Sequence, residues 1–159
     1  MVMIFSSKDI LEMAIHMEEE GEKFYNLFSE KTSKESIKNV FNYLAMEEKR
    51  HAETFKEIYK SIENEEFLSA YPDEEANKYL HLWISSKIFI NWDKILKEKT
   101  FFDEKSAIDL AISLEKDSIL FYYEISEFVS SNNKNLLREI IKQEKSHLSQ
   151  LTTLREAFS

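Results

Sequence analysis

The chain has 159 residues, of which 43% are hydrophobic and 32% are charged, a balance that suits one domain spanning residues 1–159 with a single core. One Gly and one Pro are too few for the tight turns of β-sandwiches and barrels, and for the glycine-rich loops that cradle phosphates. We therefore predict an all-α protein. Because the sequence has no Cys, disulfides, thiolate metal sites and a Cys nucleophile are excluded.

The charge balance limits the choice of partners. The chain has 21 basic and 30 acidic residues, and its net charge of −9 argues against binding to nucleic acid or to an anionic membrane surface. The apolar start at residues 1–5 is shorter than a signal peptide, and no apolar run is long enough to span a membrane. The absence of Cys, of a signal peptide and of a membrane-spanning run is compatible with the cytoplasm, where we expect the protein.

Helical periodicity predicts four long helices, at residues 7–31, 34–64, 103–130 and 133–158. Their expected N-caps are Ser6 or Ser7, Ser33, Asp103, and Asn132 or Asn133. The crossover at about 65–102 contains Pro72 followed by acidic residues, which predicts a fifth helix over 72–97. Two helices, a long crossover and two further helices form the connectivity of a ferritin-like four-helix bundle.

An internal repeat relates the two halves of the chain. Residues 10–18 (ILEMAIHME) match residues 107–115 (AIDLAISLE) at a shift of 97 positions. At a shift of 96, Glu48-x-x-His51 coincides with Glu144-x-x-His147. The sequence therefore predicts a duplicated helical hairpin with an approximate two-fold axis, and a site on that axis would use both halves equally.

Polar residues interrupt the apolar stripe of each long helix. The 3–4 spacing places an acid and an imidazole one turn apart on the second and fourth helices, and one acid on each of the other two. The six candidate metal ligands are Glu18, Glu48, His51, Glu115, Glu144 and His147. Four buried carboxylates need compensation, and two divalent cations balance their charge, whereas one does not. Oxygen and nitrogen ligands without sulfur suit iron or manganese, and also zinc in vitro.

Other residues lie on the same helix faces. Gly21 and its repeat partner Ser118 are small and should leave space beside the acids. Tyr25 and Tyr122 are candidate catalytic residues whose hydroxyls either hold a ligand carboxylate or are bonded elsewhere in the core, and Tyr123 is the alternative to Tyr122. Either Glu20 or Asp117 could orient a ligand histidine, whereas Glu47 should point outward.

At these residues the chain resembles the rubrerythrin-type ferritin-like di-iron proteins, in the form without a rubredoxin module. The motifs that carry the resemblance are EEEGEKFY (18–25), LAMEEKRH (44–51), LEKDSILFYY (114–123) and KQEKSH (142–147). The resemblance implies a centre of two iron ions, with manganese or a mixed pair as alternatives. It also implies a reaction with hydrogen peroxide or dioxygen, in oxidative-stress defence or in iron handling.

The sequence departs from the family pattern at two points, and both affect the function that we expect. The family motif Glu-x-x-Glu on the third helix reads Glu115-x-x-Ser118 here, so one ligand is missing. The Cys-ligated rubredoxin iron is also absent, so we expect an oxidoreductase that takes electrons from a separate carrier. The alternatives are a ferroxidase, storage or delivery protein, and a binding protein that the metal only stabilises. The apolar crossover also allows a homodimer contact.

Overall fold

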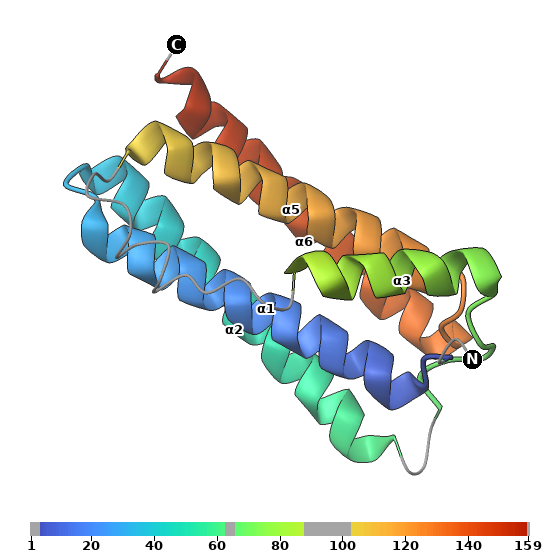
Figure 1. Ribbon diagram of the computed structural model, residues 1–159. Helices are drawn as coiled ribbons and strands as arrows, with labels where there is room; N and C mark the ends of the chain where they lie inside the picture. The colour runs from blue at the N-terminus through green and yellow to red at the C-terminus, as the bar shows by residue number, and fades with distance from the viewer. Residues whose placement is uncertain (1–3, 63–65, 88–102, 159) are drawn as a thin grey trace.

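The computed structural model describes residues 4–62, 66–87 and 103–158 (Figure 1). These residues form five helices and no strand, as the all-α prediction requires. The helices are α1 (Ser7–Lys31), α2 (Glu35–Ser61), α3 (Glu74–Lys87), α5 (Glu104–Ser126) and α6 (Ser131–Glu156). The predicted part of the crossover helix beyond residue 87, with Ile88, Ile90, Trp92 and Ile95, lies outside the described residues.

The four long helices form two hairpins that pack into a bundle. Figure 1 shows α1 beside α2 and α5 beside α6, with α3 lying along α1 and α5. The ring of Trp83 on α3 stacks on Phe121 of α5, with ring centroids 4.8 Å apart. The predicted bundle of two repeated hairpins, with a helix from the crossover packed beside it, is therefore confirmed over the described residues.

Two predicted helix starts are correct because their caps are local. Ser6 caps α1 in a capping box with Asp9, and the Asp103 side chain accepts a hydrogen bond from the backbone amide of Lys105 at the start of α5. The predicted Ser33 cap is wrong, because α2 follows Lys34, whose side chain makes no capping bond. Helix α3 begins at Glu74 rather than at residue 72, and Asp73 accepts from the amide of Ala76 at 2.8 Å.

The connection between α5 and α6 differs from the prediction. Helix α5 ends at Ser126 rather than at residue 130, and α6 follows Ser130 rather than Asn132 or Asn133. The physical reason is a pairing with residues near 68, in which Leu68 and Val129 form an antiparallel bridge. The amide of Ser130 donates to the carbonyl of Phe67 at 2.8 Å, and this bond holds the backbone outside either helix.

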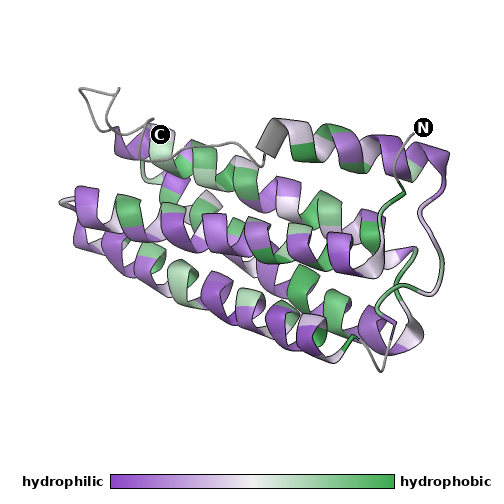
Figure 2. Cartoon of the chain, turned by 60° about the horizontal axis from the view of Figure 1, so that its bottom comes forward, coloured by the Kyte–Doolittle hydropathy of each residue, from purple (hydrophilic) through white to green (hydrophobic). Residues whose placement is uncertain are grey.

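The buried hydrophobic side chains form two separate clusters. One contains Phe55, Phe121 and Leu137, and the other contains Phe24, Phe41 and Ile108. Hydrophilic and hydrophobic residues alternate along every helix in Figure 2, because each helix turns one stripe toward the bundle interior. The polar residues of the predicted site interrupt these apolar stripes between the two clusters.

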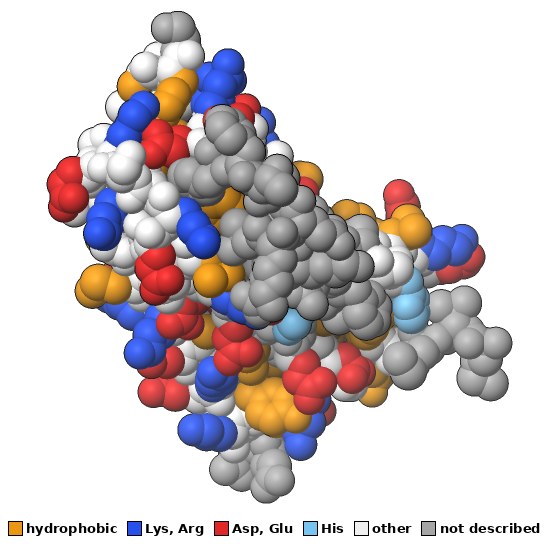
Figure 3. Space-filling view, turned by 60° about the vertical axis from the view of Figure 1, so that its left-hand side comes forward, with side chains coloured by type: hydrophobic (Ala, Val, Ile, Leu, Met, Phe, Trp, Pro, Cys, Tyr) orange, Lys and Arg blue, Asp and Glu red, His pale blue; other side chains and the backbone are white. Residues whose placement is uncertain are grey.

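The face of the molecule drawn in Figure 3 carries charges of both signs. Figure 3 shows acidic and basic side chains interspersed over the described part of one face, with single hydrophobic side chains between them. Among the described residues, no helix is long and apolar enough to cross a membrane.

Candidate metal centre

The structure brings all six predicted ligands together in the interior of the bundle. Helices α1 and α5 contribute one glutamate each, and α2 and α6 contribute a glutamate and a histidine each. Every one of the six has an exposed fraction of 4% or less. The periodicity that places these residues on interior stripes is therefore realised in the folded chain.

The six residues form two overlapping groups. Glu18, Glu48, His51 and Glu144 offer ligand atoms within 4.8 Å of one another, and so do Glu48, Glu115, Glu144 and His147. Glu48 and Glu144 belong to both groups. Two adjacent cation positions that share two carboxylates are the arrangement that a dimetal carboxylate site requires.

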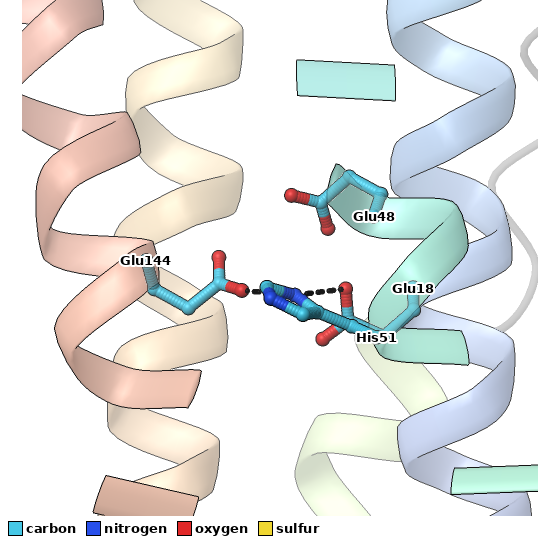
Figure 4. A group of neighbouring side chains, drawn as sticks. All are labelled: Glu18, Glu48, His51 and Glu144. Carbon is cyan, nitrogen blue, oxygen red and sulfur yellow. Dashed lines mark hydrogen bonds and ion pairs between the residues drawn. The ribbon is translucent and has the colours of Figure 1, made fainter. Parts of the chain in front are cut away.

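The imidazoles turn their Nδ1 atoms toward the carboxylates. Nδ1 of His51 lies 2.8 Å from Oε1 of Glu144 and 3.3 Å from Oε2 of Glu18, as Figure 4 shows. Nδ1 of His147 lies 3.2 Å from Oε1 of Glu48 and 3.6 Å from Oε2 of Glu115. The two imidazole rings stack with centroids 5.9 Å apart, so the two cation positions are neighbours.

The donor atoms fit a pair of cations. Apart from the imidazole–carboxylate ion pairs, five buried side-chain atoms in the cluster have no hydrogen-bond partner: Glu48 Oε1, Glu115 Oε2, both carboxylate oxygens of Glu144, and His147 Nδ1. An unsatisfied polar group in a protein interior costs about 1–3 kcal/mol, and more when it is charged. Divalent cations held by these atoms would remove that cost, and they suit a set of oxygen and nitrogen donors.

Protons compensate the cluster when no cation does. Burial, followed by the charge of Glu144, raises the pKa of Glu48 and Glu115 well above the usual glutamate value. Burial opposes the charged form of both histidines, but the neighbouring carboxylates outweigh it. Glu144 and Glu18 raise the pKa of His51 to about 11. Glu115 and Glu144 raise the pKa of His147 to about 9. Burial would raise the pKa of Glu144 too, but the two imidazoles lower it. Cations that bind here displace protons from the imidazoles.

Two tyrosines connect the hairpins crosswise at the cluster. The Tyr25 hydroxyl on α1 donates to Oε1 of Glu115 on α5, and the Tyr122 hydroxyl on α5 donates to Oε1 of Glu18 on α1. Burial, followed by the adjacent carboxylate, raises the pKa of both phenols, so they remain donors at neutral pH. Tyr123 is 47% exposed and accepts a hydrogen bond from Lys145, so Tyr122 is the residue that faces the site. A catalytic role for Tyr25 and Tyr122 stays a prediction.

Gly21 permits the close approach of a ligand. A Cβ atom at this position would lie 3.0 Å from Oε2 of Glu48, closer than real Cβ atoms normally come to another atom. Its repeat partner Ser118 is buried and donates its hydroxyl to the carbonyl of Leu114, four residues earlier. Both residues leave space beside the acids, as their small size predicts.

The sequence reasoning missed Gln143. Its Oε1 lies 2.6 Å from Nε2 of His51, so Nε2 carries the proton and Nδ1 is left to bind a cation. Gln143 therefore holds His51 in the way that had been expected of Glu20 or Asp117. The available signal was its place directly before Glu144 in the repeated motif.

Glu47, the repeat counterpart of Gln143, is also placed differently from the prediction. It is only 8% exposed rather than outward-pointing, and it accepts a hydrogen bond from Arg50 at 2.6 Å. Arg50 lies one helical turn later, and this local ion pair allows the carboxylate to be buried.

This fold and cluster define the class of dimetal carboxylate proteins built on a four-helix bundle. The family model for rubrerythrin matches residues 9–155, and the chain therefore belongs to the rubrerythrin family. The chain is also similar to a crystal structure from Thermotoga maritima, of a protein assigned as ferritin-like and diiron-carboxylate. The two are 34% identical over 98% of each chain, with a TM-score of 0.75. No curated protein matches the chain.

Proposed function

We propose that the protein binds two iron ions in its buried cluster and reduces hydrogen peroxide or dioxygen with electrons from a separate carrier. The observation that carries this proposal is the pair of overlapping ligand groups that share Glu48 and Glu144. Membership of the rubrerythrin family supports it, as does the likeness to a protein assigned as a diiron-carboxylate protein. Iron is the metal we propose, and manganese or a mixed pair would suit the same donors.

The chemistry follows from the number of metal ions. A ferrous pair held by Glu18, Glu48, His51, Glu115, Glu144 and His147 would supply two electrons. With two protons, these electrons would convert hydrogen peroxide to two water molecules, or dioxygen to hydrogen peroxide. Two divalent cations also balance four ionised carboxylates, so charge favours the filled site. The sequence has no Cys to hold a second, Cys-ligated iron centre, and we propose that the electrons for the next turnover come from a separate carrier.

The residues of the chain prepare the site for this reaction. Tyr25 and Tyr122 hold the carboxylates of Glu115 and Glu18 in place, and Gln143 fixes the tautomer of His51. The hydrophobic clusters on either side exclude bulk water, which strengthens each electrostatic contact inside the bundle. Glu48 and Glu144 belong to both ligand groups, so these two carboxylates would help to hold either cation.

Anaerobic loading with ferrous iron, followed by stopped-flow addition of peroxide, tests the proposal. We expect oxidation much faster than that of free ferrous iron, and its loss in the Glu18→Ala, Glu115→Ala double variant, which keeps the two Glu-x-x-His motifs. The matched control is Glu19→Ala, because Glu19 lies next to Glu18 but its side chain is 44% exposed and pairs with Lys56. Equal oxidation rates for the wild type and the double variant would refute the proposed reaction.

A further inference from the structure

A small cavity adjoins the cluster between α1 and α5, on the side where α3 lies. Its volume is about 50 Å³, which exceeds the space that one water molecule needs. The side chains that matter here are His16, Glu20, Glu48, Glu115, Asp117 and Ser118, all of which line it. The cavity therefore joins the metal cluster to a part of α1 and α5 that the proposed reaction does not use.

Burial increases along this cavity toward the cluster. His16, Glu20 and Asp117 are half-buried, whereas Glu48 and Glu115 are 4% and 3% exposed. Its two inner carboxylates each have a buried oxygen without a hydrogen bond, Oε1 of Glu48 and Oε2 of Glu115, and both oxygens face Nδ1 of His147, at 3.2 and 3.6 Å. The cavity is thus a path from half-buried polar groups to the fully buried ligands.

The half-buried part of the cavity has unpartnered polar atoms as well. Nε2 of His16 and Oε2 of Glu20 are inaccessible to solvent, and neither has a hydrogen-bond partner. The two residues are one helical turn apart on α1, so they face the same side of the helix. Buried polar atoms are almost always paired, and atoms of this kind that line a cavity point to a polar occupant.

The lining favours a cation. Four carboxylates, from Glu20, Glu48, Glu115 and Asp117, contribute to it beside apolar side chains such as Met17, Trp83 and Leu114, and none of its described lining residues is Lys or Arg. An anion would be repelled by these carboxylates, whereas a cation would be attracted by them. Carboxylate oxygens and one imidazole nitrogen are donors that divalent first-row metals accept.

We propose that this cavity is the loading route of the metal cluster, with His16 and Glu20 as the transit ligands that bind an incoming divalent cation and pass it to Glu48 and Glu115. The inference rests on the proposed function, because it requires a metal cluster to fill. The small side chain of Ser118 and the absence of a side chain at Gly21 keep the inner end of the route open.

The test follows cobalt(II) uptake by the metal-free full-length protein in a stopped-flow spectrometer, through the visible absorption of the bound ion. In the double variant His16→Gln, Glu20→Gln we expect uptake to slow by roughly tenfold, because the local attraction for the cation is weakened. The final spectrum and the final content of two cobalt ions per chain should be unchanged. Ser118→Val, which narrows the cavity without removing a donor from His16 or Glu20, should slow uptake too.

The matched control is Glu19→Gln, which removes the same charge from the same helix outside the cavity. Its uptake rate should stay within about twofold of the wild type, since a single exposed charge contributes little. Double-variant uptake at the wild-type rate with two ions bound would overturn the loading route while the metal cluster stands. A wild-type protein that binds no cobalt would instead overturn the proposed function, and the loading route with it.

Discussion

The two cluster glutamates outside the Glu-x-x-His motifs are each held by a tyrosine from the opposite hairpin. Tyr122 donates to Glu18, and Tyr25 donates to Glu115. The contacts join α1 to α5, so they position ligands and also tie the two repeats together. A phenol that fixes a ligand carboxylate acts on metal affinity without binding the metal itself.

The Tyr122→Phe substitution tests this arrangement, because it removes only the hydroxyl. We expect metal affinity to fall on the order of tenfold, as is usual when a partner of a metal ligand is lost. The free energy of unfolding should fall by about 1–2 kcal/mol, the usual cost of a lost buried hydrogen bond. Competition with a chelator measures the affinity, and urea unfolding measures the stability.

Tyr123→Phe is the control for this substitution. Tyr123 is the next residue on the same helix, but it is 47% exposed and its hydroxyl bonds to Lys145. Its variant should match the wild type in metal affinity. Equal affinities for all three proteins would show that the Tyr122 hydroxyl does not position Glu18 for metal binding.

Gln143 gives a second prediction, for the histidine side of the cluster. Gln143→Leu removes the acceptor of the His51 Nε2 proton, and the imidazole is then free to rotate or to change tautomer. We expect roughly tenfold weaker cobalt(II) binding, which titration followed by visible absorption would measure. Gln150→Leu, the same change two turns later on α6, should leave binding unchanged, and an equal loss in both variants would contradict the assigned role of Gln143.

At the scale of the helices, Glu104 joins the end of α1 to the start of α5. The hydroxyl of Thr32, the C-cap of α1, donates to Oε1 of Glu104 at 2.6 Å, and Lys34 lies 3.3 Å from its Oε2. Burial would raise the pKa of Glu104, but Thr32 and Lys34 lower it below the usual value. A carboxyl group whose pKa is lowered by folding stabilises the fold at pH values above the usual glutamate pKa. This stabilisation is lost as the pH falls through the lowered pKa.

The Glu104→Gln variant should therefore be less stable than the wild type by about 1 kcal/mol at neutral pH. The difference should vanish at a pH below the lowered pKa, where Glu104 is protonated in both the folded and the unfolded chain. Urea unfolding at the two pH values measures it, with the exposed Glu57→Gln as the control. A difference that persists unchanged at low pH would exclude charge as its origin.

Some helix boundaries could be predicted from the neighbouring residues in the sequence, and others could not. Ser6 and Asp103 could be identified as caps because each bonds to a backbone amide within three residues. The end of α5 at Ser126 could not be identified in this way, because it depends on the pairing of Leu68 with Val129, which lie far apart in the sequence. Side-chain periodicity continues past such a point and carries no signal of the distant partner.

At the scale of the whole molecule, the repeat made the cluster predictable. Glu48-x-x-His51 and Glu144-x-x-His147 lie on apolar stripes of equivalent helices, and a bundle brings such stripes together at the axis. The partners of these ligands were not predictable in the same way. The bond from Gln143 to His51 and the cavity beside Ser118 depend on the rotation of each helix, which periodicity determines only to within about one residue.

The account also predicts how far the fold depends on metal. A cation that binds only to the native state stabilises it by about 2.7 kcal/mol when the free cation is at a hundredfold excess over Kd. This free energy raises Tm by roughly 5–10 °C in a chain of this size. Calorimetry before and after chelation measures this shift. An unchanged Tm would mean that the unpartnered atoms of Glu48, Glu115, Glu144 and His147 carry no cation in the folded protein.

The most direct test of the central claim is the metal content of untagged protein after anaerobic reconstitution with ferrous iron, measured by mass spectrometry against protein concentration. The account predicts two iron ions per chain, because the two ligand groups share Glu48 and Glu144 and form one cluster with two positions. Retention of no metal would contradict it. A single ion per chain would contradict it as well, because one of the two ligand groups would then hold no cation.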